Sequence, residues 1–81
     1  MSEIDIPEFA WKTVSKFEIP NNSYVCGYSS NGSVIYVGLV EYRGCLYPAK
    51  VFPSRREARI TVGGIEKSLS TWCKLLVVTS R

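Results

Sequence analysis

Turn-forming dipeptides that contain glycine divide the chain into short segments and so limit the folds open to it. They are Asn31-Gly32, Arg43-Gly44 and Gly63-Gly64. Asn31-Gly32 is the strongest hairpin signal, because a type I′ turn requires a positive φ at both central residues. It predicts a hairpin that pairs residues 24–28 with residues 35–39.

The segments between these turns are rich in β-branched and aromatic residues. Residues 34–37 read Val-Ile-Tyr-Val, residues 58–62 alternate between apolar and polar side chains, and residues 72–78 form a final apolar run. Pro48 is expected to interrupt one such run. Residues 65–76 have a competing helical pattern, but their serine and threonine content argues against a helix. The sequence therefore predicts an all-β fold, a small antiparallel sheet of about six to eight short strands.

The chain length of 81 residues is that of one domain. The first ten residues carry Glu3, Asp5 and Glu8 and no lysine or arginine. We interpret residues 1–10 as an acidic N-terminal strap and residues 11–81 as a single β domain. An acidic start is unlike a signal peptide, and no apolar run approaches the roughly 20 residues that cross a bilayer. We therefore expect a cytoplasmic protein without a signal peptide or a transmembrane segment.

The side chains used most often for catalysis and metal binding are scarce in this sequence. Histidine is absent, which removes it as a general base and as a zinc ligand. Cys26, Cys45 and Cys73 are spaced too widely for a zinc site or a disulfide framework, and we expect them to be small buried apolar side chains. We predict that the protein is not an enzyme and has no metal site and no cofactor.

The positive net charge of +3 includes one short basic stretch. Arg55, Arg56 and Arg59 lie there with Glu57. A nucleic-acid-binding protein presents a wider basic patch than this. A solvated loop that opens a strand is therefore favoured over a nucleic-acid interface.

Several motifs occur in one order along the chain and carry a resemblance to a known family. They are Trp11, residues 19–25 (Ile-Pro-Asn-Asn-Ser-Tyr-Val), 27–32 (Gly-Tyr-Ser-Ser-Asn-Gly), 35–38 (Ile-Tyr-Val-Gly), Gly44 with Leu46, 48–51 (Pro-Ala-Lys-Val), 63–66 (Gly-Gly-Ile-Glu) and 75–77 (Leu-Leu-Val). The ordered set resembles the DM9 (DM-nine) repeat, present here as a single repeat.

The resemblance implies a fold and a function. Members of the family are small all-β modules, often two in tandem with strands exchanged between them, and several invertebrate members are mannose-binding lectins that act in pattern recognition in innate immunity. We therefore expect a mannose-type carbohydrate-binding module that forms a strand-exchanged or paired homodimer. The alternative is a protein-interaction or assembly module of the same fold that has lost sugar binding.

The resemblance also implies a sugar site. The family uses an acidic residue of its Gly-x-Asp loop and the lysine of its Pro-Gly-Lys motif; in this sequence Ser29 stands at the acidic position and Lys50 at the lysine. An ammonium group donates hydrogen bonds to sugar hydroxyls, and a carboxylate accepts them. We expect Lys50 to be the main polar anchor, with Ser29 and Asn31 on the opposite wall. Glu66 is expected to bond turn amides or a basic residue.

Overall fold

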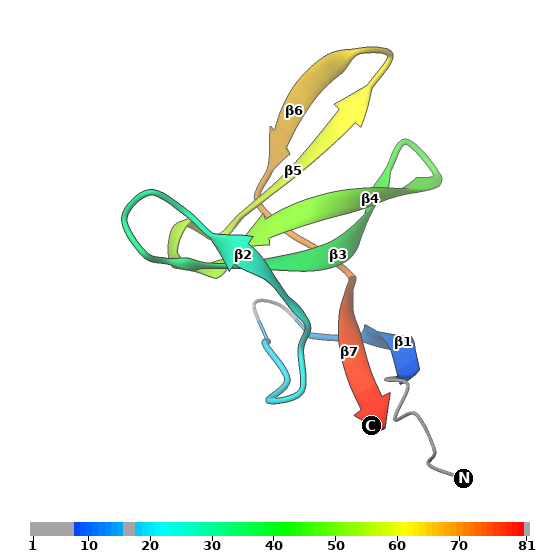
Figure 1. The fold of residues 1–81 in the computed structure, drawn as a ribbon. Helices are drawn as coiled ribbons and strands as arrows, with labels where there is room; N and C mark the ends of the chain where they lie inside the picture. The colour runs from blue at the N-terminus through cyan, green and yellow to red at the C-terminus, as the bar shows by residue number, and fades with distance from the viewer. Residues whose placement is uncertain (1–7, 16–17, 81) are drawn as a thin grey trace, which may run out of the picture.

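Strands pair in one open antiparallel sheet in the computed structural model, which describes residues 8–15 and 18–80 (Figure 1). Within these residues the strands are β1 (Glu8–Thr13), β2 (Val25–Tyr28), β3 (Val34–Tyr42), β4 (Cys45–Phe52), β5 (Glu57–Val62), β6 (Ile65–Leu69) and β7 (Lys74–Ser80). Their order is β1-β7-β3-β4-β5-β6, and β2 also pairs with β3. The all-β prediction of six to eight short strands is confirmed.

A single turn of 3₁₀ helix, η1 (Pro53–Arg55), connects β4 to β5. It contains three residues, and the described part of the chain holds no helix long and apolar enough to cross a membrane. The basic stretch identified in the sequence therefore forms η1 and the start of β5, as expected for a loop that opens a strand. Strand β1 begins at Glu8, ahead of the boundary predicted after residue 10, and residues 1–7 of the predicted strap lie outside the described residues.

Two of the glycine dipeptides form the tight turns that their sequences indicate. Arg43 and Gly44 have φ values of 52° and 81°, and the flanking residues Tyr42 and Cys45 are strand partners. Gly63 and Gly64 have φ values of 57° and 80° between partners of β5 and β6. Positive φ at both central residues is the signature of the type I′ turn. The β3–β4 and β5–β6 hairpins are therefore fixed by local backbone conformation.

The hairpin at Asn31-Gly32 is present, but the predicted type I′ turn is wrong. Strand β2 pairs with β3, whereas the turn has positive φ at Gly32 and not at Asn31. The Gly32 amide donates to the Ser29 carbonyl at 2.9 Å, and the Ser29 amide donates to the Ser33 carbonyl at 2.8 Å. The Asn31 side-chain Oδ1 accepts from the Ser33 amide at 3.0 Å, and this local bond stabilises a longer turn in place of the two-residue one.

One face of the sheet, the core face, carries the buried apolar side chains. Val40 of β3, Val51 of β4 and Ile60 of β5 are at most 2% exposed, and Trp72, in the connection to β7, packs over them. Their positions follow the alternation of a strand, in which every second residue points to the same side. The opposite side, the outer face, carries Lys50 and the other residues that alternate with this core.

Strand β7 approaches β3 closely at Gly38, which is the partner of Leu75. A Cβ added to Gly38 would lie 2.8 Å from the Lys74 carbonyl oxygen and 2.8 Å from Cγ2 of Val51. Only a glycine leaves this space, so the residue sets how near the two strands can come.

Strand β4 runs without a break through Pro48, contrary to the predicted interruption, and the break occurs in its pairing with β5. Pairs in the β3–β4 ladder alternate between hydrogen-bonded and non-hydrogen-bonded, beginning with the hydrogen-bonded pair Tyr42 and Cys45. In this alternation Pro48 is in a non-hydrogen-bonded pair, so its backbone nitrogen and carbonyl point away from β3 and toward β5. Proline has no amide to donate, so the β4–β5 ladder stops at Lys50 and Arg59. Beyond this pair the β5–β6 hairpin diverges from β4 (Figure 1).

Candidate functional site

A cleft of about 500 Å³ opens where β5 diverges from β4. Its lining residues come from five strands, β2 to β6, and combine apolar and charged groups. They include Val37 of β3, Pro48 and Lys50 of β4, Arg59 and Thr61 of β5, and Glu66 of β6. The cleft therefore exists because Pro48 ends the ladder between its two walls.

The strand register places a row of paired residues from neighbouring strands side by side on the outer face. Val37 is the partner of Lys50, Lys50 is the partner of Arg59, and Arg59 is the partner of Ser68. Directly paired residues point to the same face, with their Cβ atoms about 5 Å apart. This row runs across β3, β4, β5 and β6, and its first three members line the candidate site.

Three polar side chains in the cleft are not used by the fold. Among the described residues, Lys50, Thr61 and Glu66 form no side-chain hydrogen bond and no ion pair. All of these residues are exposed, and Thr61 and Glu66 are direct cross-strand partners. The expected bonding of Glu66 to turn amides or to a basic residue is thus not seen within the described part of the chain. An ammonium, a hydroxyl and a carboxylate therefore remain available to a ligand.

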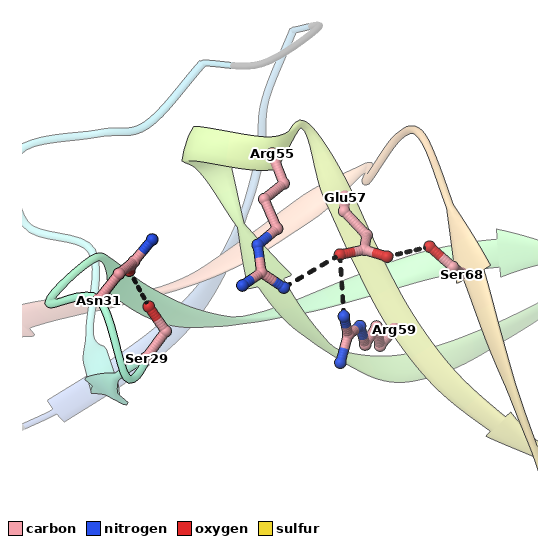
Figure 2. A network of polar contacts seen from close by, with 6 residues as sticks. All are labelled: Ser29, Asn31, Arg55, Glu57, Arg59 and Ser68. Carbon is pink, nitrogen blue, oxygen red and sulfur yellow. Dashed lines mark hydrogen bonds and ion pairs between the residues drawn. The ribbon is translucent and has the colours of Figure 1, made fainter.

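A second group of polar residues, which includes Arg59 of the cleft, is joined by ion pairs and a hydrogen bond (Figure 2). One carboxylate oxygen of Glu57 lies 3.3 Å from Nη2 of Arg59 and 3.9 Å from Nη1 of Arg55, while the other accepts a hydrogen bond from the Ser68 hydroxyl. The guanidinium groups of Arg55 and Arg59 lie 5.5 Å and 5.0 Å from the ring centre of Phe52, which they cover. Arg59 is therefore held in place from two sides.

The bonds to Glu57 also affect its titration. The hydrogen bond from Ser68 lowers the pKa of the Glu57 carboxyl most, and burial, the second-largest effect, opposes it. The hydrogen bond from Arg59 and the positive charges of Arg59 and Arg55 lower the pKa further. Glu57 is consequently ionised at neutral pH and acts as the anchor of this network.

A family model described as the DM9 repeat matches residues 3–69. This range includes every residue named above in the cleft and in the Glu57 network. The chain belongs to the DM9 repeat family. Neither a curated protein nor a solved structure matches this DM9 repeat.

The residues predicted from the family motif fall in two parts of the DM9 repeat. Lys50 lines the cleft, whereas Ser29 and Asn31 lie in the β2–β3 turn and do not line it. The Ser29 hydroxyl donates to Oδ1 of Asn31 at 2.5 Å, so these two side chains are bonded to each other (Figure 2). The structure brings Ser29 and Asn31 together and gives Lys50 different neighbours.

Sequence reasoning missed Arg59 and Thr61 as members of the site and assigned Glu66 to a structural role. The alternation over residues 58–62 does indicate that Arg59 and Thr61 share a face. The pairing of β4 with β5, which brings them beside Lys50, has no comparable signal in the sequence.

The cysteines differ from the expectation that all are buried. Cys26 and Cys45 are exposed and Cys73 is half-buried, and all three thiols are free. Cys26 lines the cleft at the irregular step in the β2–β3 register, which turns it outward.

Proposed function

We propose that this DM9 repeat binds a carbohydrate of the mannose type in the cleft at Lys50. The observation that carries the proposal is the exposed Lys50 ammonium, which has no bonding partner among the described residues and shares an open cleft with Glu66. Lysines on ordinary surfaces are common, but this one is combined with a carboxylate and a hydroxyl that are also unused.

These groups match the chemistry of a sugar. Lys50 offers donors to neighbouring hydroxyl oxygens, Glu66 accepts from hydroxyl protons with charge-assisted strength, and Thr61 can do either. Val37 and Pro48 offer apolar surface to the C–H groups of the ring. Glu66 thereby supplies the acidic acceptor that Ser29 lacks in the family's motif position. Pattern recognition in innate immunity, which the family resemblance implies, is the role we propose for such binding.

Calorimetry with methyl α-mannoside tests the proposal. We expect Lys50→Ala and Glu66→Gln each to weaken binding at least about tenfold, because each removes a charged hydrogen-bonding partner. Lys12→Ala is the matched control, since Lys12 is an exposed strand lysine on β1, outside the cleft, and its removal should leave the affinity unchanged.

Ser29→Asp distinguishes the cleft from the β2–β3 turn. With the sugar in the cleft, restoring an acid at Ser29 has little effect on affinity. A large gain in affinity from this change, with no loss from Glu66→Gln, would contradict the cleft and favour a site that Ser29 and Asn31 share with Lys50.

The proposal includes a homodimer, and an exposed apolar patch on β1 and at residues 24–25, where β2 begins, supports it. Phe9, Trp11, Tyr24 and Val25 are each at least 40% exposed, and the rings of Phe9 and Tyr24 meet edge to face at 5.5 Å. The radius of gyration of 13.9 Å exceeds the roughly 12 Å of a compact domain of this length. A second copy would cover this patch and carry a second cleft, which favours binding to repeated sugars.

Sedimentation at micromolar concentration tests the dimer. We expect a mass twice the 9.1 kDa of the chain, and a shift toward the single chain in Trp11→Ser. A stably folded single chain in the unmodified protein would contradict this part of the proposal.

A further inference from the structure

Two cationic residues of the cleft lie side by side on neighbouring strands. Lys50 and Arg59 are direct cross-strand partners and both line the cleft. Like charges at directly opposite positions of an antiparallel pair destabilise the sheet. A pair of this kind at the last rung of a ladder, beside an open cleft, is relieved when an anion binds between the two side chains.

The nearby carboxylates do not balance these cations. Glu57 serves two guanidinium groups at once, those of Arg55 and Arg59, and also accepts from Ser68. Glu66 is the acidic side chain that lines the cleft itself. Three cations therefore share two carboxylates on this part of the outer face, and Lys50 is the one that forms no ion pair within the described residues.

Arg59 is held ready for an anionic ligand. Its guanidinium lies 3.3 Å from Glu57 on one side and 5.0 Å from the centre of the Phe52 ring, and its side chain is 35% exposed. A guanidinium has five N–H donors in a rigid plane, so a contact with one carboxylate leaves donors for another acid group. Because Arg59 is already held by Glu57 and Phe52, its side chain loses little conformational entropy when an acid group binds.

We infer that the ligand of this cleft is an acidic sugar, one that carries a carboxylate, sulfate or phosphate group. This inference rests on the proposed function, since the same cleft is used. The acid group lies between Lys50 and Arg59, and the ring hydroxyls lie toward Thr61 and Glu66. Glu66 then fixes the orientation, because its carboxylate repels the acid group and accepts from hydroxyls.

Calorimetry at low salt with methyl α-mannoside, mannose 6-phosphate, glucuronate and inorganic phosphate tests the inference. We expect the two acidic sugars to bind about tenfold more tightly than the neutral one, the effect of one charge-assisted contact at a partly exposed site. Raising the salt concentration should reduce this preference while leaving the affinity for methyl α-mannoside nearly constant.

Arg59→Gln should bring the ratio of acidic to neutral affinities close to one, and Lys12→Gln, which removes an equal charge on β1, should leave the ratio unchanged. Equal affinities for acidic and neutral sugars in the unmodified protein would overturn the inference and leave carbohydrate binding intact. Inorganic phosphate that binds as tightly as mannose 6-phosphate would also overturn it, because the sugar would then contribute nothing. Absence of binding by every sugar would overturn both the inference and the proposed function.

Discussion

The strands β3 to β6 and the pair β1–β7 are held together in different ways. In the β3–β4 hairpin the closing partners, Tyr42 and Cys45, are separated by a two-residue turn. The β1–β7 pair instead joins opposite ends of the chain, with Glu8 as the partner of Ser80. It is continuous with the rest of the sheet through β7, which pairs with β3 at Gly38 and Leu39.

This difference separates the part of the sheet that is specified locally from the part that depends on tertiary contact. Each hairpin of β3–β6 has its own turn, whereas β1 and β7 must meet after nearly the whole chain has been ordered. The candidate cleft is lined by β3 to β6 and by Cys26 of β2, and by neither β1 nor β7. We therefore expect the β1–β7 pair to open at a lower free energy than the strands that hold the cleft.

Gly38→Ala should break the link between the two regions and have the largest effect. The new Cβ would approach the Lys74 carbonyl and Val51 to 2.8 Å, so β7 must move away from β3. We expect a loss of about 2–3 kcal/mol in the free energy of unfolding, at the upper end for overpacking. Urea unfolding measures the loss, and hydrogen exchange should show it as lost protection in β1 and β7 first.

Gly27→Ala is the matched control for this prediction. Gly27 also lies in a strand of this sheet, but an added Cβ meets no atom within 4 Å. We expect a change within about half a kcal/mol. Equal losses in the free energy of unfolding for the two variants would mean that the close approach at Gly38 does not connect the β1–β7 pair to the strands β3 to β6.

Arg43→Asn should sharpen the contrast by strengthening a hairpin alone. Arg43 has a φ of 52°, a conformation that asparagine tolerates better than arginine. Against this gain stands the loss of the Arg43 contact with the Tyr42 ring at 5.3 Å. We expect a net stabilisation of about 0.5 kcal/mol, with the protection of β1 and β7 unchanged; Arg43→Ala, which keeps the strain, should be no more stable than the original protein.

The pH dependence of Glu57 should give the smallest effect, confined to the locally specified strands. Because its folded pKa is lowered, Glu57 stabilises the protein above its ordinary pKa of about 4.3, and this stabilisation is lost as the pH falls through the lowered value. The free energy of unfolding, measured between about pH 6 and pH 3, should therefore fall more steeply with decreasing pH in the original protein than in Glu57→Gln.

Ser68→Ala provides the control for Glu57, because the Ser68 hydroxyl is the main cause of the lowered pKa. This variant should lose part of the acid sensitivity. Identical pH profiles in all three proteins would show that the network at Glu57 has no influence on folding.

The sequence predicted the strands that glycine turns delimit and not the contacts between distant ones. Gly63-Gly64 correctly marked the β5–β6 hairpin, since positive φ there is a local property. At Asn31 the same rule failed for the turn type, because the side chain accepts from the Ser33 amide and favours a longer loop. The pairing of β1 with β7 is a long-range choice that no dipeptide encodes.

The candidate site was predictable to a similar extent. Lys50 followed from the family motif and does line the cleft. Arg59 and Glu66 depend on which strands become neighbours, and on Pro48 ending a ladder that would otherwise close the cleft. The sequence predicted that Pro48 would interrupt its own strand, but Pro48 instead interrupts the pairing of that strand with β5.

The pairing of Glu8 with Ser80 also determines how the fold responds to mechanical load. Both ends of the described sheet leave from the same end of the β1–β7 ladder, so a pull on them acts across the strands and along the hydrogen bonds. Under this loading the bonds break one at a time from the Glu8 end. Tension applied at the chain ends therefore peels β1 from β7 at low force, while the strands around Lys50 carry load only after this pair has opened.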